Sequence, residues 1–304
     1  DSTSYLPPEL LAREGIVVVP LYIVEGERQI PETEIDDQAA FLERLRRSER
    51  LPTTSQPSVG DFVAAYEPLL ADGRTVVSIH ISGGLSGTAE SARQAAAQLE
   101  REGKGGERVH VIDSRTAAGG LGFLVLAAAA AARTSGTAAA VEQRVEAARA
   151  SLRMWFGIDT LEYLRRGGRI GAARAWLGTA LKLKPILTVD GEMVPVERVR
   201  THRRLVERMV EYARELADAG CTAWAVQHVA DSGTAETLVE RCRAIFGCDP
   251  YFVSEIGPVL SVHTGPGCSA SAGSTRACSR DSGSDTSRGA RCRAPGSGGQ
   301  RAAQ

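Results

Sequence analysis

The sequence predicts an α/β protein of two domains: an N-terminal α/β domain with a parallel sheet over residues 1–150, and a C-terminal α+β domain with a mostly antiparallel sheet over residues 151–267. Three observations predict this class. A chain of 304 residues is long enough for two domains. Strand-like and helix-like segments alternate in the first half, as they do in parallel sheets with right-handed crossovers. In the second half, Asp190-Gly191 between two apolar runs indicates a hairpin.

The strands and helices of the first domain are predicted from two kinds of sequence pattern. Continuous β-branched runs indicate buried strands, and they cover residues 16–24, 75–81 and 108–115. Apolar residues at helical spacing indicate helices, and these cover residues 6–15, 36–46, 58–70, 89–99, 117–133 and 137–152. Between them, residues 26–35 are predicted to form a surface hairpin or loop, and residues 51–58 a polar turn.

The second domain mixes hairpin and helix patterns. Its predicted strands are residues 154–158, 182–188, 193–199, 222–229 and 251–256. Its predicted helices are a short one within 159–170 that ends at a glycine pair, and two longer ones over 201–219 and 234–246. The following segment, 257–267, contains His263 and is predicted to be a loop.

The two ends of the chain depart from this pattern. From residue 268 onward Ser, Arg, Gly, Ala and Cys dominate and no periodicity survives, so we expect residues 268–304 to be a disordered low-complexity tail. A shifted reading frame is our preferred origin for it, and a natural low-complexity tail is the alternative. At the other end Asp1 begins directly on a polar turn, so we expect the first strand of the N-terminal domain to be missing.

Composition excludes several classes of function. A net charge of −1 argues against a nucleic-acid-binding surface. The longest apolar run, 117–132, is too short and too rich in Gly and Ala for a membrane span, so a buried helix explains it better. The six cysteines show no C-x-x-C spacing, which argues against a zinc or redox site. With no signal peptide at the start, we expect a reducing, cytoplasmic location.

A glycine-rich stretch over residues 82–88, Ser-Gly-Gly-Leu-Ser-Gly-Thr, lies between a predicted strand and a predicted helix. Such a turn directs backbone N–H groups and a helix N-terminus to one place, which favours an anion. Ser82, Ser86 and Thr88 add hydroxyl groups. The simpler alternative is a tight turn in which Ser86 or Thr88 only caps the helix.

Three polar clusters are candidates for one binding site. They contain Thr54 and Ser55, then Ser86 and Gly87, and finally His263 and Thr264. Ligands gather at the carboxyl ends of parallel strands, where the first two clusters are expected to lie. Hydroxyl-rich residues without a metal-ligand set suit a carboxylate or phosphate, so we expect no metal and no cofactor. Taken singly, each hydroxyl could instead belong to a cap or turn, and His263 could be a structural or surface histidine.

Other function classes remain as alternatives. A serine hydrolase would use Ser86 and His263, but Gly84-Leu85-Ser86-Gly87-Thr88 lacks the second glycine of the G-x-S-x-G turn. No G-x-G-x-x-G follows the first strand, which argues against a dinucleotide site. A module that binds a non-lipid anion, such as a phosphosugar, stays open. Arg166 and Arg169 beside a glycine pair are candidates to clamp a phosphate or an acidic partner, or simply complement a helix C-terminus.

Nine stretches in this order resemble the DegV family, the fatty-acid-binding subunits of the bacterial fatty acid kinase. The resemblance covers nearly all of residues 1–267. Its stretches are Asp1-Ser2-Thr3 with Leu6-Pro7, Val19-Pro20-Leu21, Thr54-Ser55-Gln56-Pro57-Ser58, Ser82 to Thr88, Ile112-Asp113-Ser114, Gly120-Leu121-Gly122, Thr160 to Ile170, Lys184-Pro185-Ile186-Leu187 and His263-Thr264-Gly265-Pro266-Gly267.

The resemblance implies a long-chain fatty acid bound between the two domains. It implies that Thr54 and Ser86 hold the carboxylate and that His263 completes the network, with Ser55, Gly87 and Thr264 beside them. A separate ATP-dependent kinase subunit would then phosphorylate the presented carboxylate to an acyl phosphate for phospholipid metabolism. The protein itself would be no enzyme, would contribute no catalytic residue and would touch a membrane surface at most transiently.

Two further implications concern the arginines and the strands. The resemblance implies that Arg166 and Arg169 contact the kinase partner or the phosphoryl group. Members of the family carry a strand before the D-S-T motif and an apolar strand after H-T-G-P-G, where this chain has Cys268-Ser269-Ala270-Ser271. We therefore expect both of these sheet strands to be lost.

Overall fold

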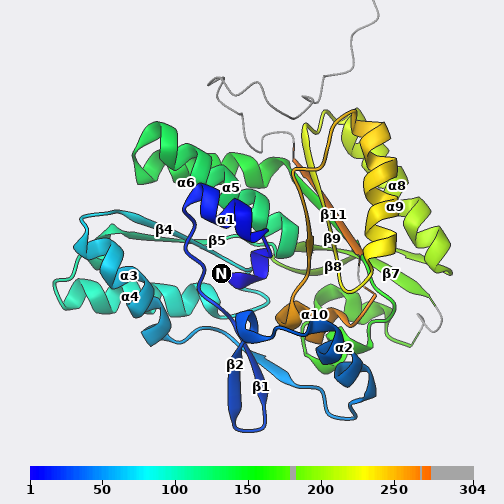
Figure 1. The fold of residues 1–304 in the computed structure, drawn as a ribbon, viewed down its shortest axis with the longest axis horizontal. Helices are drawn as coiled ribbons and strands as arrows, with labels where there is room; N and C mark the ends of the chain where they lie inside the picture. The colour runs from blue at the N-terminus through cyan, green and yellow to red at the C-terminus, as the bar shows by residue number, and fades with distance from the viewer. Residues whose placement is uncertain (179–182, 268, 275–304) are drawn as a thin grey trace, which may run out of the picture.

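The computed structural model describes residues 1–178, 183–267 and 269–274 (Figure 1). The first half of the chain contains two small sheets. The strands are β1 (Tyr22–Glu25), β2 (Arg28–Pro31), β3 (Thr53–Ser55), β4 (Val76–His80) and β5 (Val109–Asp113). The helices are α1 (Pro8–Glu14), α2 (Gln38–Arg47), α3 (Val59–Ala71), α4 (Thr88–Arg101), α5 (Ala118–Ser135) and α6 (Ala138–Ser151).

The parallel pair β4–β5 lies between two layers of helices. Because side chains alternate along a strand, Ile79 of β4 packs against α5 and α6 on one face, and Val76 packs against α3 and α4 on the other. Helix α5 is long and apolar enough to cross a membrane by length and composition alone, but 61% of it is buried as a core helix. The predicted buried helix is therefore present.

The second half of the chain forms one six-stranded sheet. Its strands are β6 (Leu152–Gly157), β7 (Lys184–Asp190), β8 (Glu192–Val199), β9 (Ala223–His228), β10 (Phe252–Glu255) and β11 (Ser269–Ser274). Their order is β10-β9-β11-β6-β7-β8, and every pair except β10–β9 is antiparallel. The helices are α7 (Glu162–Arg166), α8 (His202–Asp218), α9 (Ser232–Phe246) and α10 (Pro258–Thr264). The predicted combination of parallel and antiparallel sheets is confirmed.

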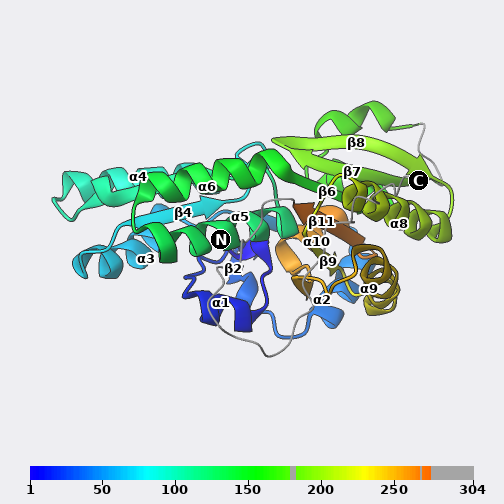
Figure 2. The same ribbon diagram turned by 90° about the horizontal axis from the view of Figure 1, so that it is seen from above.

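The two halves share a core. Figure 2 shows α3 and α4 at one end of the elongated molecule and β8 and α8 at the other. Between these ends, one buried apolar cluster takes side chains from both halves, among them Leu85 of the glycine-rich loop and Phe156 of β6. The division of the chain at residue 150 stays a prediction, but the largest apolar cluster contains residues from both sides of it.

The predicted strand over residues 16–24 is only partly formed, since the ladder begins at Tyr22. Before Tyr22, backbone groups of this segment form hydrogen bonds with Ser2 and not with a neighbouring strand. The Val19 carbonyl accepts from the Ser2 N–H (3.1 Å), and the Leu21 N–H donates to the Ser2 hydroxyl (3.0 Å). The predicted polar turn over 51–58 likewise contains a short strand, β3, which pairs antiparallel with β1.

Two predictions about the C-terminal part are wrong. His263 and Thr264 lie in the last turn of a helix, α10, and not on a loop; Pro258 starts that helix, which Gly257 precedes. Residues 269–274, predicted to begin a disordered tail, form β11 between β9 and β6, so the strand after H-T-G-P-G is present and not lost as expected. Main-chain hydrogen bonds to a strand on each side need no apolar pattern, which explains why periodicity failed to indicate it. Residues 275–304 of the predicted tail lie outside the described part of the chain.

Candidate functional site

The glycine-rich loop makes a close contact with the second half of the chain. A Cβ at Gly84 would lie 2.3 Å from the carbonyl oxygen of Gly191 in the β7–β8 turn, so only glycine fits there. The Ser82 hydroxyl donates to that same Gly191 carbonyl. The loop therefore spans the junction between the two halves, with Ile81 and Leu85 directed into their shared core.

Ser86 and Thr88 do not cap the helix that follows the loop. The N-cap of α4 is Gly87, which has no side chain to act as a cap. Instead the Ser86 hydroxyl lies 2.9 Å from the Thr88 hydroxyl. The simpler interpretation of these residues as caps is thus not supported, and the Ser86 side chain faces a small cavity.

Thr54 meets His263 across 209 positions of sequence. Strand β3 pairs Thr54 with Ile23 of β1, and the Thr54 Oγ1 lies 2.8 Å from the His263 Nε2. His263 is 7% exposed. Its Nδ1 is buried without a hydrogen-bond partner among the described residues, and it faces Gly167, where a Cβ would approach it to 2.3 Å. Gly167, which follows α7, therefore leaves the space that this imidazole occupies.

The imidazole of His263 is neutral at physiological pH. Burial, with a smaller contribution from the positive charge of Arg169, lowers the pKa of His263 to about 4. A neutral imidazole donates from one nitrogen only. His263 can therefore hydrogen-bond Thr54 or a ligand without bringing a charge into the site.

Arg169 supplies the positive charge at this cavity. Its Nε donates to the Leu85 carbonyl (3.2 Å) and its Nη1 to the Gly167 carbonyl (2.8 Å). The side chain lines the cavity, and the residue is exposed. Arg166 lies apart from it, because its guanidinium donates to the Glu49 carbonyl in the segment between α2 and β3. The two arginines thus face different surroundings.

The cavity that these residues line has a volume of about 40 Å³. Its lining is half polar and half apolar, and consists of Thr54, Ser55, Gln56, Ser86, Arg169, His263, Leu21, Ile81, Leu85, Met193, Val259 and Leu260. Larger clefts of about 500, 540 and 740 Å³ lie elsewhere, but none of them is lined by Thr54, Ser86 or His263. Thr54, Ser86 and His263, which the sequence predicts, therefore line the smallest of these cavities.

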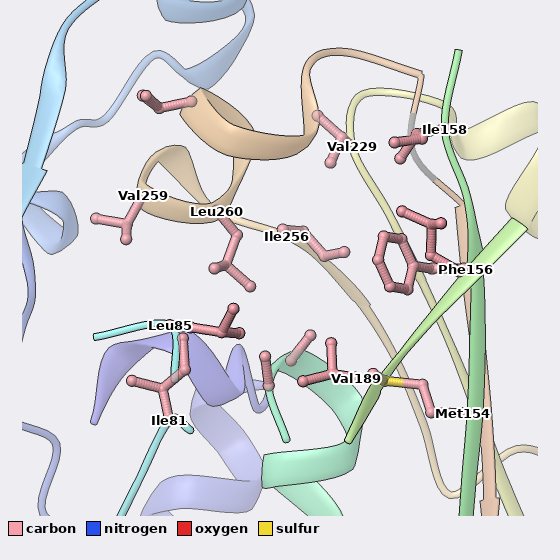
Figure 3. Close-up of a cluster of buried hydrophobic side chains, with 14 of the residues drawn as sticks. Ile81, Leu85, Met154, Phe156, Ile158, Val189, Val229, Ile256, Val259 and Leu260 are labelled. Carbon is pink, nitrogen blue, oxygen red and sulfur yellow. The ribbon is translucent and has the colours of Figure 1, made fainter. Parts of the chain in front are cut away.

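An apolar region continues behind the cavity. Figure 3 shows Ile81 and Leu85 facing Leu260 and Val259 of α10, with Met154, Phe156 and Val189 of the second half beyond them. All of these side chains are buried. The cavity is consequently lined by polar residues on one side and adjoins a packed apolar cluster on the other, a combination that suits an amphipathic ligand.

The structure brings together only part of the predicted site. Thr54, Ser55, Ser86 and His263 line one cavity, whereas Gly87 and Thr264 do not. The Thr264 hydroxyl donates to the Leu260 carbonyl of its own helix (3.1 Å). Sequence reasoning missed Met193, which lies just after the hairpin turn, and Glu32, whose carboxylate is buried beneath α10. No local signal marks either residue.

The D-S-T motif supports the site from outside it. The Asp1 carboxylate accepts from the Ile81 N–H (2.8 Å) and lies 3.3 Å from the His80 Nδ1. It thereby holds the end of β4 where the glycine-rich loop begins. The motif residue Ser2 donates to Glu32. Neither Asp1 nor Ser2 lines the cavity, so both act on it through other residues.

Comparisons with known proteins agree with one another. A family model described as "Uncharacterised protein, DegV family" matches residues 1–274. A DegV domain-containing protein of Streptomyces coelicolor is 39% identical over 271 residues, which cover 88% of this chain and 94% of that protein. Protein DegV of Bacillus subtilis is 33% identical over 270 residues, with the same coverage of 88% and 94%.

Solved structures give the same family. A structure described as fatty acid binding of a DegV family protein from Thermus thermophilus superimposes with a TM-score of 0.79 at 35% identity, covering 90% of this chain and 97% of that one. The structure of DegV from Bacillus subtilis, described as a fatty acid binding protein, has a TM-score of 0.79 at 32% identity and covers 90% of this chain and 96% of that one.

Proposed function

The chain belongs to the DegV family, and from this membership we propose that it binds a long-chain fatty acid at the junction of its two halves and presents the carboxylate to a separate kinase subunit. The observation that carries the proposal is the meeting of Thr54, Ser86 and His263 at the polar end of a buried apolar cluster. Fatty acid binding is described for the Thermus thermophilus and Bacillus subtilis proteins of this family.

The head group would be held by uncharged donors. Hydroxyl groups of Thr54 and Ser86 face the cavity beside the neutral His263, and Arg169 adds a positive charge at the exposed side. Hydrogen bonds to a charged group contribute about 1.5–3 kcal/mol each, less the cost of removing water from the carboxylate. The polar end should therefore set orientation and specificity.

The acyl chain would supply most of the affinity. Burial of each CH₂ contributes about 0.8 kcal/mol, so a chain of about 16 carbons contributes on the order of 10 kcal/mol before ordering costs. Ligand pockets usually measure about 300–1,000 Å³, far more than the 40 Å³ found beside Thr54. Binding must therefore displace side chains of the apolar cluster, such as Leu85 and Leu260.

The kinase role that we propose is supported by the exposed arginine at the cavity. A carboxylate between Thr54 and Ser86 would lie close to Arg169, which reaches the surface. In an ATP-dependent kinase the carboxylate oxygen would attack the γ-phosphorus, ADP would leave and an acyl phosphate would form. Arg169 would stabilise the added phosphoryl charge, and Arg166 would contact the partner from the side of α2. The protein would then be a cytoplasmic binding subunit that meets membranes only transiently.

The serine hydrolase alternative lacks two contacts that it needs. Within the described part of the chain, no hydrogen bond joins Ser86 to His263, and His263 Nδ1 has no carboxylate partner. A Ser-His-Asp mechanism requires both. A non-lipid anion would contact only the polar side of the cavity and none of the adjoining apolar cluster, so we favour the amphipathic ligand.

Native mass spectrometry of the full chain tests the proposal. We expect a co-purified fatty acid whose mass is released on denaturation, and reduced occupancy in Ser86→Ala. Ser135→Ala, an exposed serine on α5 that bonds its own helix (2.8 Å), is the matched control. A phosphosugar in the site, or no binding of added fatty acid, would contradict the proposal. Labelling of Ser86 by a fluorophosphonate probe would favour the hydrolase.

A further inference from the structure

Glu32 is a buried carboxylate that accepts hydrogen bonds from residues near the start of the chain and from helix α10. It is 5% exposed, and it lies in a short 3-10 turn, Glu32–Glu34, just after β2. Its Oε2 accepts from the Val259 N–H (3.0 Å) and from the Tyr5 hydroxyl (3.0 Å), and its Oε1 accepts from the Ser2 hydroxyl. Within the described residues no Lys or Arg forms an ion pair with it.

These contacts provide hydrogen-bond acceptors for N–H groups in the first turn of helix α10. The first N–H groups of a helix have no partner within it, and Gly257, the N-cap of α10, has no side chain to supply one. The Val259 N–H donates to Glu32 and the Leu260 N–H donates to the Tyr5 hydroxyl (3.2 Å). A carboxylate from 227 positions earlier in the chain therefore caps the helix that carries His263.

A count of the protons shows why a carboxylate suits this position. The Ser2 hydroxyl accepts the Leu21 N–H, and the Tyr5 hydroxyl accepts the Leu260 N–H, so each has its own proton left to give. Both protons go to Glu32, which also receives the Val259 N–H. An amide or a protonated carboxyl would add a further donor to a group that already receives three hydrogen bonds.

The charge is costly to bury, and the same hydrogen bonds offset that cost. Burial raises the pKa of Glu32, while the donors on Ser2, Val259 and Tyr5 and the positive charge of the Asp1 amino group act in the opposite direction. A buried charge is retained only where hydrogen bonds or an opposite charge compensate for lost water. A leucine here would avoid the cost but would leave the start of α10 without a partner.

Helix α10 connects Glu32 to the residues of the cavity. Val259 and His263 are four residues apart, so they lie on the same side of α10 one turn from each other. Val259 and Leu260 line the cavity, and His263 reaches Thr54 from the end of the same helix. A second side chain, Gln38, donates to the Ile256 carbonyl just before α10 (2.6 Å).

We propose that Glu32 is a positioning residue for the head-group site: its carboxylate holds the first turn of α10 and thereby sets the contact between His263 and Thr54. The link to a fatty acid rests on the proposed function. The positioning itself can be measured without any ligand.

The test compares Glu32→Gln with the wild-type full chain by NMR of labelled histidines. The resonance of His263 among the five histidines is assigned from its loss in His263→Gln. We expect the His263 pKa to rise in Glu32→Gln from about 4 towards the ordinary 6.5, because a loosened α10 admits water to the imidazole. Glu34→Gln, an exposed neighbour in the same turn, should leave the titration unchanged.

A purely structural role would lower the unfolding midpoint of Glu32→Gln without moving the titration of His263 in the folded protein, and that result would overturn the proposal. If Glu32→Gln does not fold, Tyr5→Phe replaces it. This variant removes one donor from Glu32 and the acceptor of the Leu260 N–H, so we expect a smaller shift in the same direction. An unmoved titration in Tyr5→Phe also contradicts the proposal.

A parallel titration with palmitate separates the two proposals. We expect Glu32→Gln to bind about tenfold more weakly than the wild type, because a misplaced His263 loses its hydrogen bond. A wild type that binds no palmitate refutes the proposed function and leaves the NMR comparison intact. Unchanged palmitate affinity with a shifted His263 refutes only the link between positioning and binding.

Discussion

His263 makes the stability of the protein depend on pH. Its pKa is lowered to about 4 in the folded chain, against 6.5 for a free histidine. Between these values the unfolded chain binds a proton that the folded chain does not. The stabilisation from a neutral His263 is therefore complete above pH 6.5 and is lost as the pH falls towards 4, with a full effect of about 3 kcal/mol.

This pH dependence is checked by urea unfolding of the wild type and of His263→Gln between pH 4 and 6.5. The difference in free energy of unfolding between the two proteins should shrink as the pH falls. His80, whose pKa burial also lowers, is present in both proteins and cancels. Parallel curves for the two proteins would show that His263 does not titrate in this way.

Thr54→Val keeps the shape of the side chain and removes its hydroxyl. Since that hydroxyl meets His263 Nε2 at 2.8 Å and faces the cavity, fatty acid affinity should fall about tenfold. Isothermal titration calorimetry provides the measurement. Thr134→Val, an exposed threonine bonded only to its own helix, should bind like the wild type; equal affinity of Thr54→Val would remove Thr54 from the site.

At the level of residues, the sequence indicates Thr54, Ser86 and His263 but does not separate them from their neighbours. Thr264 follows His263 directly, yet it faces its own helix, because successive helical residues point in directions about 100° apart. That distinction depends on α10, whose first turn is held by Glu32 from far away in the chain. Local patterns contain no information about such a partner.

At the level of elements, the end of α7 constrains the histidine. A Cβ at Gly167 would lie 2.3 Å from His263 Nδ1 and 3.2 Å from the Tyr163 carbonyl. Gly167→Ala should therefore push the imidazole away from Thr54. We expect about 1–3 kcal/mol of lost stability together with weaker fatty acid binding.

Thermal unfolding and binding titrations of Gly167→Ala give the two measurements. The matched control is Gly233→Ala in α9, where an added Cβ meets nothing within 4 Å. It should be neutral or slightly stabilising, since alanine favours a helix over glycine. Normal binding by Gly167→Ala would show that the imidazole has room to move.

The elements that the sequence predicts well share one property. Long helices with a buried face, such as α5 and α8, and the hairpin at Asp190-Gly191 are set by local patterns and lie where we expected them. The elements that it misses, β3, α10 and β11, are three to seven residues long. Their partners are distant strands or side chains, so their own residues carry little signal.

At the level of the whole molecule, β11 connects two parts of the second sheet. It pairs with β9 on one side and with β6 on the other, so without it the sheet divides into β10–β9 and β6–β7–β8. A chain of residues 1–267 should therefore lose on the order of 5 kcal/mol of stability. A chain of residues 1–274 keeps β11 and is the comparison for this loss.

Urea unfolding followed by circular dichroism compares the three chains. We expect a lower midpoint and a broader transition for residues 1–267, because the two parts of the sheet no longer unfold as one. If residues 1–267 and 1–274 unfold at the same midpoint, β11 contributes little to the fold.

The position of β11 also has a consequence for synthesis. Every other strand of its sheet precedes it in the chain, so during translation β9 and β6 leave the ribosome before the strand that lies between them. Each then presents an open edge, and open edges pair readily with other chains. A slow or paused ribosome upstream of residue 269 would prolong this interval. Nascent chains of this protein are thus most prone to aggregate in the last moments before their sheet can close.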